Sequence, residues 1–387
     1  VSGNTVLGES ALDASVSGGD NTAIGKNALT TLTSGTKNTA VGKDALLLNT
    51  TGQLNVAIGQ AALDANTTGS QNTACGEGSL SENTTADNNT AVGYHSLEKN
   101  ETGTNNVAVG ANALDANTTG IDLTAVGFNS LTNSTGGENT AVGSRSLQAN
   151  TSGIRNSAIG YLSLRDNTTG SSNTALGSFA LDANTTGASN LALGENALGA
   201  NTTASNNTAV GRLALSANTT GHSNVAVGAQ ALDSNTTAND NTAVGRDSLT
   251  ANTTGANNTG LGRAALIANT TAGDNTAVGY FALFSNTTGA NNVAVGANAL
   301  DANTTAGKNT AVGYKSLSAN TTGEENTALG RASLTQSTTG SNNVAVGNLA
   351  LDANTTASSN TAVGSSALSA NTTGANNTGL GSASLDA

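Results

Sequence analysis

Apolar and polar positions recur along this chain with a period of seventeen residues. Numbered from its first Asn, the repeat reads N-T-A-V-G-x-x-A-L-x-A-N-T-T-G-x-x, as in residues 275–291. Position nine is always Leu, position five is always Gly, and position eight is Ala or Ser. Position four is Val, Ile or Leu, with Cys75 as the exception. Charged side chains never occupy positions four and nine, so the pattern indicates a definite inside and outside.

The repeats keep their register almost without interruption. They begin at residue 4 and recur every seventeen residues until a one-residue deletion near residues 131–139, after which the register holds to the end. This gives 23 repeats, the last one unfinished. A fixed period of this length is typical of a solenoid, in which each unit contacts only its neighbours. We therefore predict one continuous repeat array over residues 1–387, without a separate globular domain.

Short strands joined by turns are the elements that this pattern predicts. Positions two to four favour β-structure, whereas Gly and the NTTG segment leave no amphipathic stretch long enough for a stable helix. We predict an all-β fold, a parallel β-solenoid or β-roll of 23 rungs. Rungs stacked about 4.8 Å apart would form an elongated rod of roughly 110 Å.

Each repeat position receives a structural role in this interpretation. Position five is expected to have positive φ or a contact that excludes a β-carbon; position fifteen is Ala in several repeats, such as Ala306, and should not need positive φ. Asn at positions one and twelve should form amide ladders between rungs. The predicted core residues are Leu12, Leu63, Leu114, Leu283, Leu300, Val278 and Val295, and the predicted turn glycines are Gly110, Gly279 and Gly296.

Composition supports a fibrous chain that associates with copies of itself. The sequence has 48 Gly, no Pro, Met or Trp, and 2% aromatic residues, which is too little for an ordinary globular core. The regular Leu also argues against a disordered linker. Burying two large apolar side chains per repeat falls short of the entropy lost in ordering seventeen residues. We therefore expect further burial between chains, in a homo-oligomer.

Charge and cysteine content exclude several classes of function. The net charge is −12, and the 13 basic residues are dispersed, which argues against nucleic-acid binding. No apolar run is long enough for membrane insertion. The single cysteine, Cys75, excludes a disulfide framework within the chain.

Candidate catalytic and metal-binding residues do not form a recognisable constellation. Cys75 takes an apolar position and is interpreted as a small hydrophobic residue; His95 and His222 lie far apart at surface positions. Calcium binding by the Asp of the LDAN segments is one interpretation, but we favour solvated turns because neighbouring repeats usually lack the Asp. Those residues are Asp64, Asp115, Asp182, Asp301 and Asp352. We predict no enzyme activity, no cofactor and no metal.

The sixteen NTT triplets are formal N-glycosylation sequons. Candidate glycosylation sites include Asn66, Asn117, Asn286 and Asn303. Asn-Thr-Thr-Gly is also favourable turn chemistry, which is the interpretation we prefer. Files of stacked threonines leave an ice-binding surface as a minor alternative.

The NTAVG, NVAVG and NSAIG cores, each followed after two residues by Ala or Ser, resemble the head repeats of trimeric autotransporter adhesins. That resemblance implies a left-handed parallel β-roll in which three chains pack around one axis. The longer consensus of residues 275–291 is also similar to the repeat arrays of bacterial and phage tail-fibre-like proteins. The repeat is longer than that of the usual adhesin head, so its outer loop must differ and the trimer geometry does not follow.

The resulting hypothesis is a structural protein, a fibre shaft or adhesin-like spacer, located outside the cell, on its surface or on a virion. Its partners would be copies of itself and a host-surface or glycan receptor. The main alternative is a self-polymerising filament subunit that stacks through uncapped ends. A glycan- or ice-binding surface is the minor alternative.

Overall fold

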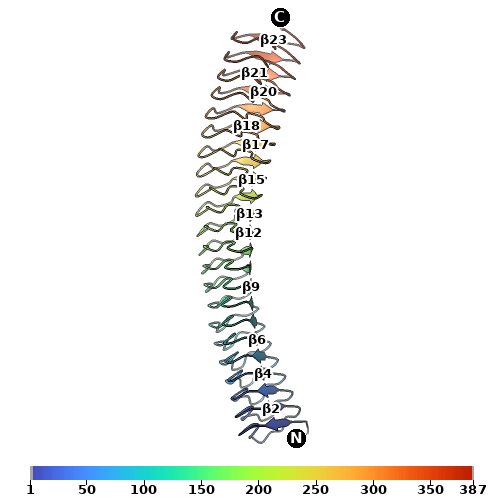
Figure 1. The fold of residues 1–387 in the computed structure, drawn as a ribbon, viewed down its shortest axis with the longest axis vertical. Coiled ribbons are helices and arrows are strands. Elements are labelled where there is room, and N and C mark those ends of the chain that lie inside the picture. The colour runs from blue at the N-terminus through green and yellow to red at the C-terminus, as the bar shows by residue number, and fades with distance from the viewer. Residues whose placement is uncertain (1–2, 386–387) are drawn as a thin grey trace. The chain divides into compact units, whose positions relative to one another are not determined.

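The structure, a computed structural model, describes residues 3–385. The chain divides into two compact units, Val1–Asn190 and Leu191–Ala387, and each is a stack of coils (Figure 1). All regular secondary structure in residues 3–385 consists of three-residue strands. In the first unit these are β1 (Thr5–Leu7), β2 (Thr22–Ile24), β3 (Thr39–Val41), β4 (Val56–Ile58), β5 (Thr73–Cys75), β6 (Thr90–Val92), β7 (Val107–Val109), β8 (Thr124–Val126), β9 (Thr140–Val142), β10 (Ser157–Ile159) and β11 (Thr174–Leu176). In the second unit they are β12 (Leu191–Leu193), β13 (Thr208–Val210), β14 (Val225–Val227), β15 (Thr242–Val244), β16 (Thr259–Leu261), β17 (Thr276–Val278), β18 (Val293–Val295), β19 (Thr310–Val312), β20 (Thr327–Leu329), β21 (Val344–Val346), β22 (Thr361–Val363) and β23 (Thr378–Leu380).

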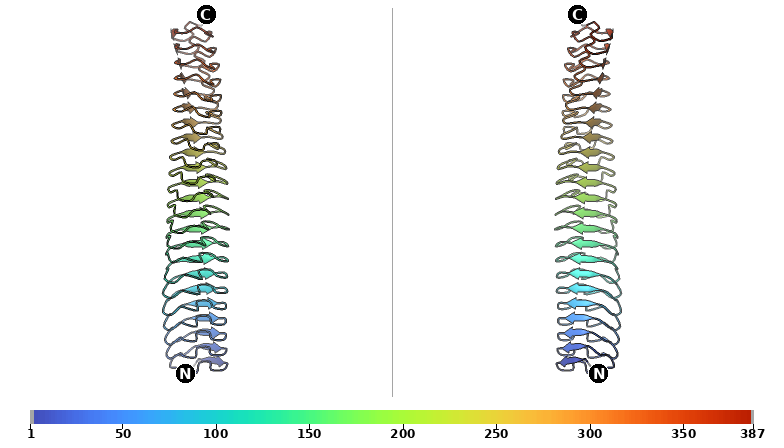
Figure 2. Two further views of the ribbon diagram at one scale, coloured as in Figure 1. Left: turned by 90° about the vertical axis from the view of Figure 1, so that its left-hand side faces the viewer. Right: turned by 90° about the vertical axis from the view of Figure 1, so that its right-hand side faces the viewer.

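Consecutive strands within each unit pair in parallel, and each strand takes the same place in its coil (Figure 2). Thr276 pairs with Val293 and Val278 with Val295, which is a register of one whole repeat. These pairings confirm the predicted all-β parallel solenoid with a seventeen-residue repeat.

The one-residue deletion lies in a turn and leaves the strand register unchanged. Thr124 of β8 pairs with Thr140 of β9, sixteen residues further along. In the short coil, the amides of Thr135 and Gly136 both donate to the Thr151 carbonyl, at 2.8 and 3.1 Å. In other coils two consecutive threonine amides make the equivalent bonds, whereas the short coil makes them with one Thr and the Gly that follows it.

The interior of most coils is narrow and contains a single large apolar side chain, whereas the coils that contain Leu32, Leu123 and Leu162 each bury a second leucine. In the coil of residues 275–291, the buried positions are one, three, eight, nine, twelve and fifteen. These are occupied by Asn275, Ala277, Ala282, Leu283, Asn286 and Gly289. Two of the six are amides, so hydrogen bonding is as prominent inside the coil as apolar packing.

The prediction that Val278 and Val295 belong to the core is wrong. Both are half-exposed, because the strands follow the two-residue alternation of β-structure and turn position three inward instead. Ala277 and Ala294 occupy the interior sites. The Leu file behaves differently: Leu12 is half-buried, and Leu63, Leu114, Leu283 and Leu300 are fully buried.

The glycine at position five has both a positive φ and a close backbone contact that excludes a β-carbon, the two features predicted for it. The φ angles of Gly110, Gly279 and Gly296 are 130°, 137° and 137°, a region that side chains with a β-carbon rarely adopt. A β-carbon on Gly279 would also lie 2.6 Å from the carbonyl oxygen of Gly296. Gly289, at position fifteen, has no positive φ, as the natural Ala substitutions at this position predicted.

The leucine at position nine has a left-handed backbone that the sequence did not predict. Leu283 has φ of 50°, and Leu300 has φ of 54°. Non-glycine residues seldom adopt this conformation. Here the Leu283 amide donates to the Ala299 carbonyl of the next coil at 3.0 Å, and the side chain fills the core. The left-handed turn thus directs the one large side chain of the coil inward.

Candidate functional surface

The amides at position twelve form a ladder inside each unit, in which Asn is replaced in a few coils, as by Leu32, Ser134 and Ser337. Asn286 donates from Nδ2 to Asn269 Oδ1 at 3.0 Å and to the Gly289 carbonyl of its own coil at 2.9 Å. Its Oδ1 accepts from Asn303 Nδ2 at 2.8 Å. This side-chain ladder is the one predicted for position twelve.

The asparagines at position one connect the coils in a different way. The backbone amide of Asn292 donates to Asn275 Oδ1 at 2.9 Å, so the bond between coils joins a side chain to the backbone. Asn275 Nδ2 donates to the Gly289 carbonyl at 2.9 Å. That carbonyl therefore accepts from both interior amides of its coil, and the two files act as one network.

The candidate glycosylation sites lie inside this network, which contradicts their use as sugar acceptors in the folded chain. Asn66, Asn117, Asn286 and Asn303 are fully buried. The nitrogen that would carry the sugar is already bonded, as when Asn66 Nδ2 donates to Asn49 Oδ1 at 2.9 Å and to the Gly69 carbonyl at 2.9 Å. The structure thus supports the alternative interpretation of the NTT triplets as structural turns.

Side chains at positions two and four of the strands form an outward surface, which we call the strand face. Position two is mostly Thr or Val, and position four is apolar throughout. These side chains are half-exposed or exposed in both units; for example, Ile58 is 42% and Leu261 is 45% exposed. In the first unit the position-four file is Leu7, Ile24, Val41, Ile58, Cys75, Val92, Val109, Val126, Val142, Ile159 and Leu176. In the second it is Leu193, Val210, Val227, Val244, Leu261, Val278, Val295, Val312, Leu329, Val346, Val363 and Leu380.

Next to the strand face, positions six and seven form a second surface, which we call the corner. It carries seven of the eight aromatic side chains of the chain and eight of the 13 basic ones. Phe284 contacts it from position ten, with its ring 4.6 Å from that of Phe281. The basic residues are therefore concentrated on one surface of the coil, although they are dispersed along the sequence.

The cysteine and histidines remain separate from one another. Cys75 is half-exposed on the strand face instead of buried. His95 Nδ1 lies 2.8 Å from Glu98 Oε2, and its ring stacks on that of Tyr94 at 4.0 Å. The exposed ring of His222 contacts Ser223 Oγ at 3.3 Å. Residues 3–385 contain no group of three or more His, Cys, Asp or Glu side chains that could hold a metal ion.

Aspartates at position ten are partly withdrawn from water. Burial, the largest cause, raises the pKa of Asp64, Asp115, Asp182 and Asp233 above its ordinary value. The buried Oδ1 atoms of Asp64 and Asp115 have no hydrogen-bond partner. Folding therefore favours the neutral carboxyl over the carboxylate at these sites.

This burial predicts a pH-dependent effect of replacing Asp64 with Asn. Because the pKa is raised in the folded state, the carboxyl contributes stability that is fully present below its unfolded-state pKa. This contribution is lost as the pH rises through the folded-state pKa. We expect Asp64→Asn to raise the melting temperature at pH 7, with a much smaller gain at about pH 3. Thermal unfolding followed by circular dichroism at both pH values measures this difference.

The control variant is Asp240→Asn, which makes the same change of charge at an exposed site. An equal gain in both variants at pH 7 would attribute the effect to net charge and contradict a role for burial.

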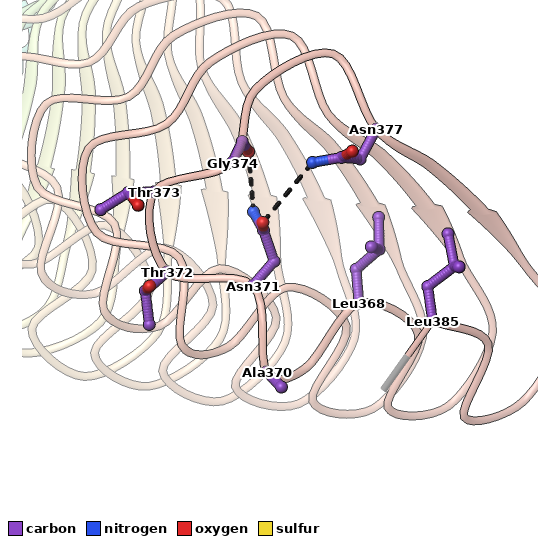
Figure 3. Close-up of a pocket in the computed structure, with 8 residues that line it drawn as sticks. All are labelled: Leu368, Ala370, Asn371, Thr372, Thr373, Gly374, Asn377 and Leu385. Carbon is purple, nitrogen blue, oxygen red and sulfur yellow. Dashed lines mark hydrogen bonds between the residues drawn. The ribbon is translucent and has the colours of Figure 1, made fainter. Parts of the chain in front are cut away.

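The hollow shown in Figure 3 lies beside the turn of residues 371–374. Leu368, Asn371, Thr372, Gly374, Asn377 and Leu385 are among the residues that line it. Asn371 Nδ2 donates to the Gly374 carbonyl at 2.9 Å, and Asn377 Nδ2 lies 3.5 Å from Asn371 Oδ1. In preceding coils the next NTT turn covers this surface, so these polar groups belong to the coil-stacking network and do not suggest a separate ligand site.

No protein-family model and no curated protein matches this chain. Within the part of the chain that the structure describes, no helix is long and apolar enough to cross a membrane.

Proposed function

We propose that this protein is a structural element, an extracellular fibre shaft or adhesin-like spacer on a cell or virion surface. The observation that carries the proposal is the two-file Asn network, which bonds coil to coil inside each unit. Nearly every coil contributes the same backbone, amide and leucine contacts, so stability is distributed along the chain and is not concentrated around one site. The resemblance to adhesin-head and tail-fibre repeats supports the same role.

The strand face is the surface through which copies of the chain would associate. It presents an apolar side chain at every position four, whereas most coils bury only one Leu of their own. Packing these files together would remove the apolar surface from water. We propose a homotrimer with the three strand faces turned toward a common axis, as the adhesin resemblance suggests.

A charge introduced on the strand face tests this association. We expect Leu261→Glu to weaken self-association at least about tenfold, because a carboxylate would be buried without a partner. Thr288→Glu places the same charge at exposed position fourteen and should leave association unchanged. Sedimentation equilibrium over a range of concentrations measures both variants against the natural chain.

Cys75 supplies an independent readout, because this single cysteine lies on the strand face. Three chains in register would bring their Cys75 thiols near one axis, so a short bismaleimide should join copies of the natural chain but not of Cys75→Ser. A folded monomer at micromolar concentrations that gives no cross-linked species would contradict the proposal. Open-ended assemblies that persist in Leu261→Glu would support the filament alternative instead.

The outward Thr and Val side chains of the strand face keep ice binding as a second candidate. They form rows with the regular spacing of the coils, as the parallel register requires. Measurable thermal hysteresis in the natural chain, lost in Leu261→Glu, would favour ice binding over the shaft.

A further inference from the structure

One stretch of the corner differs in charge from the rest of the chain. Across the eight coils that begin between Asn207 and Asn326, positions six and seven carry five basic residues and one acidic residue. We call these side chains the basic ridge. It comprises Arg212, Arg246, Asp247, Arg263, Tyr280, Phe281, Tyr314, Lys315 and Arg331. The whole protein has a net charge of −12, so the ridge is a positively charged region on an acidic protein.

Aromatic rings are interleaved with the cations of the ridge. The Arg263 guanidinium lies 5.8 Å from the ring centres of both Tyr280 and Phe281, whose rings stack at 3.9 Å. The Lys315 ammonium lies 5.6 Å from the ring centre of Tyr314. The two tyrosines and both cations are exposed. The ridge therefore offers flat apolar surfaces and positive charge side by side.

Several ridge cations also have no carboxylate partner. Arg246 pairs with Asp247 at 2.9 Å, and Arg212 pairs with Glu195 at 3.3 Å. Among the residues that the structure describes, Arg263, Lys315 and Arg331 make no ion pair. The corner of the first unit has three cations: Lys26 and Lys43 each lie within 3.4 Å of a carboxylate oxygen, and the Arg145 guanidinium lies 6.0 Å from the centre of the Phe128 ring.

The acidic residues of the same coils lie at other repeat positions. Apart from Asp247, they occupy positions ten, sixteen and seventeen, and they are Asp233, Asp240, Asp274, Asp301, Glu324 and Glu325. A double-stranded nucleic acid carries one phosphate per about 1.7 Å of its axis, far more than three unpaired cations spread over eight coils could bind. The arrangement suits a chain with sparser negative charge.

We propose that the basic ridge binds an acidic polysaccharide whose sugars bear carboxylates. The rings of Tyr280, Phe281 and Tyr314 would stack against the apolar faces of sugar rings, while Arg263, Lys315 and Arg331 would bind the carboxylates through charge-assisted hydrogen bonds. Because successive coils are about 4.8 Å apart, the ridge presents these groups in a line along which an extended polymer can lie. The proposal is independent of the fibre role and of self-association through the strand face.

The test uses the full chain with polygalacturonate and with its fully methyl-esterified form, which has the same backbone without the charge. In affinity gel electrophoresis at low salt, we expect the de-esterified polymer alone to retard the natural chain. The combined variant Arg263→Gln, Lys315→Gln and Arg331→Gln should weaken this binding about tenfold. Tyr280→Ala with Phe281→Ala should also weaken it, which charge attraction alone would not require.

Lys26→Gln with Lys43→Gln is the matched control, since it removes corner cations that already have carboxylate partners. Its binding should equal that of the natural chain, and circular dichroism should show all variants folded. Equal retardation by both polymers, or no loss in the triple ridge variant, would overturn the proposal. A triple variant that keeps full polysaccharide binding but sediments as a smaller species would instead identify the ridge as a contact between copies.

Discussion

Replacing Gly279 with Ala is expected to lower the unfolding free energy of the second unit by about 3 kcal/mol or more. Gly279 has φ of 137°, and its new β-carbon would lie 2.6 Å from a backbone oxygen and 2.7 Å from a backbone carbon of Gly296. These atoms cannot move aside as the end of a flexible side chain could. The Gly279 amide is also held by the Leu261 carbonyl at 2.8 Å, so relieving the clash would separate neighbouring coils.

The matched control is Gly260→Ala in the preceding coil. Position three has no positive φ, and Ala277 already occupies it, fully buried, in the next coil. The close neighbour of the new β-carbon would be the Ser248 hydroxyl at 2.6 Å, which belongs to a side chain that can rotate. We expect a much smaller loss in urea unfolding, and limited proteolysis should open the chain near Gly279 only in the first variant. Equal loss of stability in the two variants would contradict the special role of position five.

Replacing Asn286 with Asp should be at least as damaging at neutral pH. The amide nitrogen of Asn286 donates to Asn269 Oδ1 and to the Gly289 carbonyl, and both are acceptors. One carboxylate oxygen would keep the bond from Asn303 Nδ2, but the oxygen that replaces Nδ2 would face the two acceptors without a donor in a buried site, at a cost of about 4 kcal/mol. Its pKa would rise on folding, so acidification should restore part of the lost stability.

Asn286→Leu separates loss of hydrogen bonding from introduction of charge. Leu32 already occupies position twelve of an earlier coil and is fully buried there. We expect the leucine variant to be more stable than the aspartate variant at pH 7 and to lack its recovery at low pH, as measured by urea unfolding. A leucine variant that is the less stable of the two at pH 7 would show that charge burial is not the dominant cost.

The period of the sequence was sufficient to predict the coils, the parallel register and the role of Gly279. A residue that is repeated at one spacing must meet its own copies when the coils stack, which is why the position-twelve ladder could also be predicted. The side on which each apolar residue lies was harder to infer. Both Ala277 and Val278 are compatible with a core, and the choice between them depends on the narrow width of the coil, which only the three-dimensional structure reveals.

Neither the basic ridge nor the burial of the sequons was predicted from the sequence, because both depend on where the coil places each repeat position in three dimensions. Arg263, Lys315 and Arg331 are far apart along the chain, and they form one surface only because their repeat positions coincide. Comparing net charge by repeat position would have revealed this grouping. By contrast, nothing in an Asn-Thr-Thr triplet shows whether the amide points outward or into the coil, because both orientations satisfy the same turn preferences.

The similarity of the coils also makes incorrect pairing possible while the chain folds. Coils that present nearly the same surface could pair with the wrong neighbour, and a slip by one whole coil would preserve most strand and amide contacts. A slip that misplaces an irregular coil would lose contacts, so the slipped pairing would be less stable than the native one. Leu123, buried at position one, provides no side-chain oxygen for the next Asn amide, and the coil that it begins has one residue fewer in its turn than its neighbours. These departures from the repeat therefore help to specify which coil lies beside which.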